Sequence, residues 1–110
     1  MSYITDVVLF IPFLKNETKA ALEEGYRDRN DNLVNFRLIE ETGPEPLFTG
    51  SKVFCSHLFG GAFNYLDAEE CKTWLTTVIG PHEAIVIFDY EDFQIEVIHM
   101  NQRGDDGWRL

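Results

Sequence analysis

The sequence predicts an α+β domain, a ferredoxin-like βαββαβ sandwich with an extra C-terminal strand and two helices on one face of an antiparallel-dominated sheet. Three observations carry this prediction. The segments follow the order strand, helix, strand, strand, helix, strand, with an added final strand. Hydrophobic residues make up 45% of the 110 residues, enough for one well-filled core. Only residues 41–51 form a long irregular segment. We therefore expect a single domain over residues 1–100 and a polar tail over residues 101–110.

The first strand and the first helix are predicted from the N-terminal 27 residues. Residues 3–13 are rich in β-branched and aromatic side chains, and the apolar run Val7–Ile11 predicts a central strand buried on both faces. Asn16 is a favourable N-cap residue, so we expect a helix that begins there and runs to about Arg27.

The middle of the chain predicts two further strands. Residues 27–32 are a polar turn, and Leu33–Glu40 alternates apolar and polar side chains as a half-buried strand does. Residues 41–51 contain two prolines and two glycines and predict a loop. Val53–Phe59 predicts the next strand, and Gly60–Gly61 before residues 62–66 permits a bulge, a sharp bend or a close backbone approach, of which we favour the bulge.

The C-terminal half predicts a capped helix and a hairpin. Asp67 is expected to cap a helix that Gly80 ends, with Glu70 placed as in a capping box. Its buried stripe is predicted to be Ala68, Cys71, Trp74, Leu75 and Val78. Ala84–Tyr90 and Phe93–Met100 are expected to pair as two strands of a hairpin.

The sheet face away from the helices is predicted to be apolar. The residues assigned to it are Ile39, Val53 or Phe54, Leu58, Ile85, Ile87, Ile98 and Met100. Because a large exposed apolar face usually marks an interface, we expect a homodimer formed through it.

The charge balance disfavours some functions and favours others. Nineteen acidic and nine basic residues give a formal net charge of −10, which repels nucleic acid and favours a basic protein partner. The N-terminus is not typical of a signal peptide, and its apolar run is too short to cross a bilayer. Two cysteines make no disulfide framework, so we expect a cytoplasmic protein without a membrane partner.

Cys55 and His57 lie two residues apart on a predicted strand and therefore point to the same face. Such a pair suits a thiolate nucleophile or two metal ligands. The other candidate ligands, Cys71, His82 and His99, do not have the spacing of a zinc motif. We interpret the pair as packing residues and expect no metal and no cofactor.

The function that the sequence favours is a small acidic binding protein that occupies a basic surface of a partner, as immunity proteins and phage inhibitors of bacterial defence systems do. Between Asp67 and His99 there are eight acidic residues and one base, Lys72. The predicted partner-binding residues are Glu69, Glu70, Asp89, Tyr90, Glu91, Asp92 and Glu96. Acidic groups steer the encounter, and a few aromatic side chains anchor the complex.

The alternative is an enzyme or binder of small molecules of the dimeric α+β-barrel type. Its pocket would lie between the helices and the sheet, and such pockets need few charged groups. The residues predicted to line it are His57, Asn64, Tyr65 and Trp74.

Overall fold

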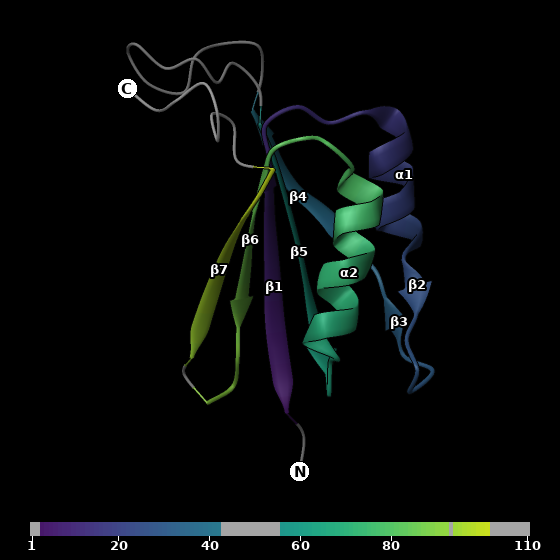
Figure 1. Cartoon of the computed structure of the whole chain (residues 1–110), viewed down its shortest axis with the longest axis vertical. Helices are drawn as coiled ribbons and strands as arrows, with labels where there is room; N and C mark the ends of the chain where they lie inside the picture. Colours follow the sequence, from purple (N-terminus) through teal and green to yellow (C-terminus); the bar gives the residue numbers. More distant parts are fainter. Residues whose placement is uncertain (1–2, 43–55, 93, 102–110) are drawn as a thin grey trace.

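The computed structural model describes residues 3–42, 56–92 and 94–101. These residues form an α+β structure, as predicted, with two helices, a five-stranded antiparallel sheet in the order β4-β5-β1-β6-β7 and a two-stranded sheet, β2-β3 (Figure 1). The elements are β1 Ile4–Ile11, α1 Asn16–Glu24, β2 Tyr26–Arg27, β3 Leu33–Val34, β4 Arg37–Thr42, β5 Ser56–Asn64, α2 Ala68–Ile79, β6 Ala84–Asp89 and β7 Ile95–Met100. Most of the predicted loop and of the polar tail lies outside the described residues.

β1 is the middle strand of the five, as the apolar run predicts, but it is buried on one face only. Val7, Leu9 and Ile11 are buried, whereas Val8 and Phe10 are half-buried. The expectation of burial on both faces is wrong, because an apolar run does not reveal which of its two faces the rest of the chain covers.

α1 has a different cap residue from the predicted one and ends earlier than predicted. Lys15 is its N-cap residue and makes no side-chain cap, and Asn16 is already helical. The helix ends at Glu24 because Gly25 adopts a φ of 76°, and its amide donates to the carbonyl of Ala21. A Cβ atom at Gly25 would collide with the carbonyl oxygen of Val34, so glycine is required there.

The predicted strand Leu33–Glu40 is divided into β3 and β4. β3 pairs with β2 around a turn that the buried carboxylate of Asp28 holds together. This carboxylate accepts hydrogen bonds from the amides of Asn30 at 2.9 Å and Asn32 at 2.8 Å, a local arrangement typical of Asp in turns. The predicted inward alternation holds, since Val34 and Phe36 are fully buried.

β5 runs without interruption through Gly60 and Gly61, so the bulge expected there is wrong. Its register with β1 is continuous from Asn64 to His57, and the irregularity lies in β4, between Leu38 and Glu40. A Cβ atom at Gly60 would lie 2.6 Å from Cδ1 of Ile39. Glycine at this position therefore serves close packing rather than a bend.

α2 carries the predicted cap. The amide of Glu70 donates to Oδ1 of Asp67 at 3.1 Å, while the Glu70 carboxylate lies near Arg29. Of the predicted stripe, Cys71 and Leu75 are fully buried, together with Ile79, and the remaining three residues are partly buried: Ala68, Trp74 and Val78.

One hydrophobic core joins the sheet to both helices. It unites buried residues of β1, β5 and β6 with Leu22 of α1 and with Cys71, Leu75 and Ile79 of α2. Figure 1 shows α1 and α2 side by side next to the sheet. We call the sheet face that enters this core the closed face; it carries Val7, Leu9, Ile11, Phe59, Val86 and Phe88.

β6 and β7 form the predicted hairpin, but the assignment of two β7 residues to the outer face is wrong. Met100 pairs with Ala84 and Ile98 with Val86, so both lie on the closed face. The alternation of side chains then directs Val97 and Ile95 to the opposite face.

Candidate functional site

The face of the sheet opposite the closed face is apolar and exposed. We call it the open face; its residues are Val8, Phe10, Ile39, Leu58, Ile85, Ile87, Ile95 and Val97. Ile39 is 60% exposed, Ile95 64% and Val97 62%, and they lie on the two edge strands. Exposed aliphatic residues that extend across a sheet are typical of an interaction surface rather than of a solvated face.

Two opposite charges lie on the β4 edge of this face. The register places Arg37 beside Gly60 and Glu40 beside Leu58, so both belong to the open face. Both side chains are exposed, and neither has an ion pair with another described residue.

Four carboxylates gather where β1 begins and the β6–β7 hairpin turns. We call them the acidic end: Asp6, Asp89, Glu91 and Asp92. Asp6 and Asp89 are register partners on neighbouring strands, and Oε2 of Glu91 accepts a hydrogen bond from the amide of Ile4 at 2.8 Å. Within the described part of the chain no lysine, arginine or histidine pairs with any of the four. No cation of the described residues therefore neutralises their negative charge.

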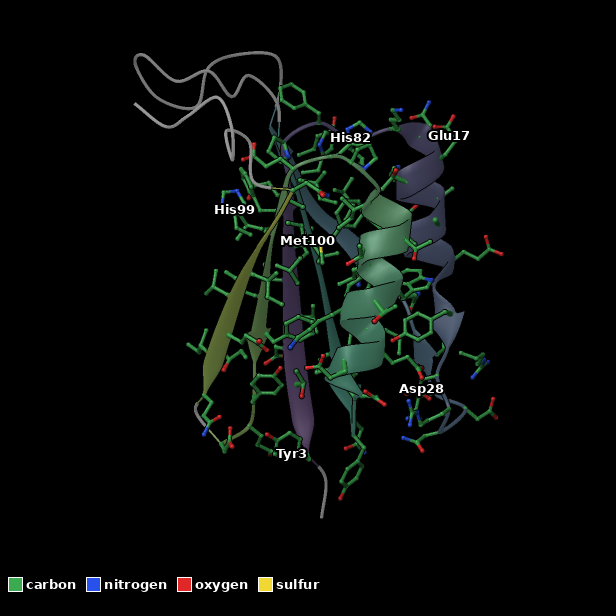
Figure 2. All side chains as sticks on the ribbon, in the orientation of Figure 1. Tyr3, Glu17, Asp28, His82, His99 and Met100 are labelled. Carbon is green, nitrogen blue, oxygen red and sulfur yellow. The ribbon has the colours of Figure 1, made fainter. Side chains whose placement is uncertain are left out.

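Tyr3 marks this end of the molecule in Figure 2, while His82 and His99 lie near the opposite end. The pKa of Tyr3 is raised, first by partial burial and then by the negative charges of Asp92 and Glu91. Tyr3 therefore lies within the negative electrostatic potential of Asp92 and Glu91, which would also attract a basic partner.

The predicted partner-binding residues divide into two groups. Asp89, Glu91 and Asp92 belong to the acidic end, but Glu96 lies on the other side of the sheet. Oε1 of Glu96 lies 2.9 Å from Nζ of Lys72 and accepts a hydrogen bond from the Tyr90 hydroxyl at 2.8 Å. These hydrogen bonds lower the pKa of Glu96, and its carboxylate raises the pKa of Lys72.

Tyr90 belongs to the same hydrogen-bond network, with Glu96 and Lys72. Burial, followed by the hydrogen bond to Glu96, raises its pKa to about 12. Its ring stacks on Phe88 at a centroid distance of 6.1 Å, and Nζ of Lys72 lies 5.6 Å from the Phe88 ring centre. Tyr90 is therefore built into the protein surface rather than presented to a partner as a free anchor.

The acids at the start of α2 also have cationic partners. Nε of Arg29 lies 3.1 Å from Asp67 and 3.4 Å from Glu70, and Lys72 lies 3.0 Å from Glu69. One partner of each pair, Arg29 or Glu69, is exposed, so the pairs are weak, but they neutralise much of the local charge.

The four residues of the predicted small-molecule pocket lie apart. His57 and Asn64 are at opposite ends of β5, about 23 Å from each other at the rise of a strand. Tyr65 is 54% exposed beyond Asn64. Trp74 packs against Tyr26 and borders a shallow groove between α2 and β2.

His57 and Cys71 are packed residues. The His57 ring is buried, with Nδ1 3.2 Å from the carbonyl oxygen of Ile11 and Nε2 3.6 Å from Glu41. Burial raises the pKa of the Cys71 thiol to about 12, so a thiolate is disfavoured at neutral pH. Cys55 lies outside the described residues, and the predicted Cys55–His57 pair stays untested.

Metal ligands are not gathered in the described ranges, where no group of three or more His, Cys, Asp or Glu side chains is placed to hold an ion. Neither described helix has the length and apolarity that a membrane span requires. Comparison with protein-family models, curated proteins and solved structures found no match for this chain.

Sequence reasoning missed Asp6, Arg37, Glu40 and the outward direction of Ile95 and Val97. One signal was present, since Asp6 is a charged residue directly before the apolar run of β1. The strand register that places Asp6 beside Asp89 was not deducible from the chain alone.

Proposed function

We propose that this protein is a small acidic binding protein that occupies a basic surface of a partner protein and thereby blocks it. The observation that carries the proposal is the position of the acidic end, which continues directly from an exposed apolar face. Carboxylates without internal cations attract a basic surface over long range, and apolar residues beside them supply contact area.

The contact is assigned to the acidic end rather than to the start of α2. Glu69, Glu70 and Glu96 would have to leave Lys72 or Arg29 before they paired with a partner, whereas Asp89, Glu91 and Asp92 have no such competing pair among the described residues. Ile4, 42% exposed at the start of β1, borders the same end. It is the apolar contact that we assign to the complex.

We also infer that the fold is the ferredoxin-like sandwich. In this topology the fourth and third strands flank the first, and the second lies beside the third. The order β6-β1-β5-β4 follows that rule, with β7 added at the edge next to β6. Support for both helices on one face comes from their shared core with the closed face and from the contact between α1 and α2.

The test is affinity capture from a lysate of the native host with three forms of the protein. One form removes three of the four charges of the acidic end by Asp89→Asn, Glu91→Gln and Asp92→Asn, and the control neutralises Glu69 and Glu70 by Glu→Gln changes. We expect the wild type and the control to retain the same basic protein, and the first variant to lose it.

Salt gives the second arm of this test. Raising the ionic strength to 1 M shortens the screening length from about 8 Å to about 3 Å and should release the captured partner from the wild type. A partner retained equally by all three forms, or retained at 1 M salt, would contradict the proposal.

A further inference from the structure

We infer that two copies of this chain associate through their open faces as an antiparallel two-fold dimer. The two-fold axis runs across the strands at the level of Leu9, Phe59 and Val86. Each acidic end then lies at one rim of the dimer, so the inference goes beyond the proposed function and does not depend on it.

The size of the open face suits a second copy. Five strands spaced about 4.8 Å apart and six residues of about 3.4 Å each cover roughly 500 Å² in projection. Two such faces bury at least about 1,000 Å², the lower limit for a specific interface. An antiparallel sheet with an apolar face packs against another sheet face to face, at a spacing of about 10 Å.

Charge decides the relative direction of the two copies. If the strands of both copies ran the same way, the paired Asp6 and Asp89 of one copy would meet the same carboxylates of the second copy. A rotation about an axis across the strands moves these acids to opposite ends of the dimer instead. Repulsion therefore disfavours the first arrangement, and the second relieves it.

The same axis matches opposite charges on the β4 edge. We call the residues that are paired with one another across the sheet a row. Arg37 lies with Gly60 in the row next to the axis on one side, and Glu40 lies with Leu58 in the row next to the axis on the other side. The rotation exchanges these two rows, so Arg37 faces Glu40 of the second copy, and the contact occurs twice. Long side chains accommodate the twist of about 30° between packed sheets.

Side-chain size is complementary along the same two rows. The row beside Arg37 contains Gly60 and Val8, and the row beside Glu40 contains Leu58 and Phe10. The rotation sets each small residue opposite a larger one of the second copy. Large residues facing small ones interdigitate, which is the packing that protein interfaces require.

The test is sedimentation equilibrium of the intact chain over a concentration series. We expect a dimer for the wild type and a monomer for Val97→Lys, which places a charge on the open face. Leu33→Lys is the matched control, because Leu33 is 45% exposed on β3, outside the open face, and it should stay dimeric. Circular dichroism confirms that each variant is folded.

Charge exchange tests the direction of packing without touching the apolar residues. Arg37→Glu alone and Glu40→Arg alone should each weaken the dimer at least about tenfold, and the double variant should restore it. Glu24→Arg on α1 is the control and should change nothing. A monomeric wild type, an unaffected Val97→Lys dimer or a double variant without recovery would overturn the inference. A wild-type monomer would leave the open face to a different partner, and it would leave the capture experiment unchanged.

Discussion

In the middle strands of the central sheet both faces carry apolar residues, but the two faces differ in what covers them. On β1, Val7 and Leu9 are fully buried under the core, while Val8 and Phe10, their direct neighbours, are half-buried on the open face. On β6 the same alternation separates Val86 from Ile85 and Ile87. In the middle of these two strands both faces are therefore apolar, and the difference is that only the closed face enters the core to which α1 and α2 contribute. We infer that stability depends on the closed face and dimer formation on the open face.

The largest effect is expected on the closed face. Phe59→Ala should lower the free energy of unfolding by about 3–5 kcal/mol, because Phe59 is fully buried and the change leaves a cavity. Val97→Ala is the matched change on the open face and should stay within about 0.5 kcal/mol for the monomer. Urea denaturation measures both, and equal losses would remove the distinction between the faces.

A smaller effect on stability is expected at the start of α2, the helix that contributes Cys71, Leu75 and Ile79 to the core. Asp67→Ala should cost about 1 kcal/mol, because the carboxylate no longer accepts a hydrogen bond from the amide of Glu70. Asp67→Asn keeps an acceptor and should recover most of the loss. If the two variants had the same denaturation midpoint, the cap would not be the cause.

The Lys72–Glu96 pair should make stability depend on pH. The pKa of Glu96 is lowered by Lys72 and Tyr90, so its contribution is present above the ordinary glutamate value of 4.5 and is lost as pH falls through its lowered value. The pKa of Lys72 is raised, so its contribution is present below 10.5 and is lost only when pH rises through the higher folded value.

Glu96→Gln should therefore lower the denaturation midpoint at pH 7, and the difference from the wild type should shrink as pH falls below 4.5 and through the lowered pKa of Glu96. Glu24→Gln on α1 is the control for the loss of one exposed charge. If the denaturation midpoint of Glu96→Gln stayed below that of the wild type at acidic pH, the Glu96 side chain would contribute by packing rather than by its charge.

The smallest effect on folding is expected at the acidic end. The double change Glu91→Lys and Asp92→Lys should alter the stability of the monomer by no more than about 0.5 kcal/mol, because both residues are exposed in a turn. It should nevertheless slow association with the captured partner and flatten the salt dependence of that rate. Stopped-flow mixing at several salt concentrations provides the comparison, and an unchanged rate would remove the acidic end from the binding surface.

The spacing of apolar residues and the capping residues were sufficient to predict most helices and strands. Asp67 as a cap, the inward alternation of Val34 and Phe36, and the β6–β7 hairpin are confirmed because each depends on residues close in sequence. The errors have a different origin. The end of α1 involves the contact between Gly25 and Val34, and the irregularity lies in β4, in the pairing of β4 with β5 between Leu38 and Glu40.

The candidate site was predicted only in part, because it too depends on contacts between residues that are distant in sequence. Local charge identified Asp89, Glu91 and Asp92, but it could not separate them from Glu96, which Lys72 neutralises from a helix 24 residues away in sequence. Asp6 joins the acidic end through strand pairing over more than 80 residues. Contacts of this range depend on the fold as a whole.

The measurement that tests this account most directly is the distance between the two acidic ends of a dimer. Spin labels on Asp92→Cys, in a Cys55→Ser background, report it by dipolar spectroscopy, and buried Cys71 stays unlabelled because its thiol is inaccessible. The antiparallel dimer places the two labels roughly 35 Å apart, from the strand rise and the sheet spacing of about 10 Å. A distance below about 20 Å, or no dipolar signal, would contradict the arrangement.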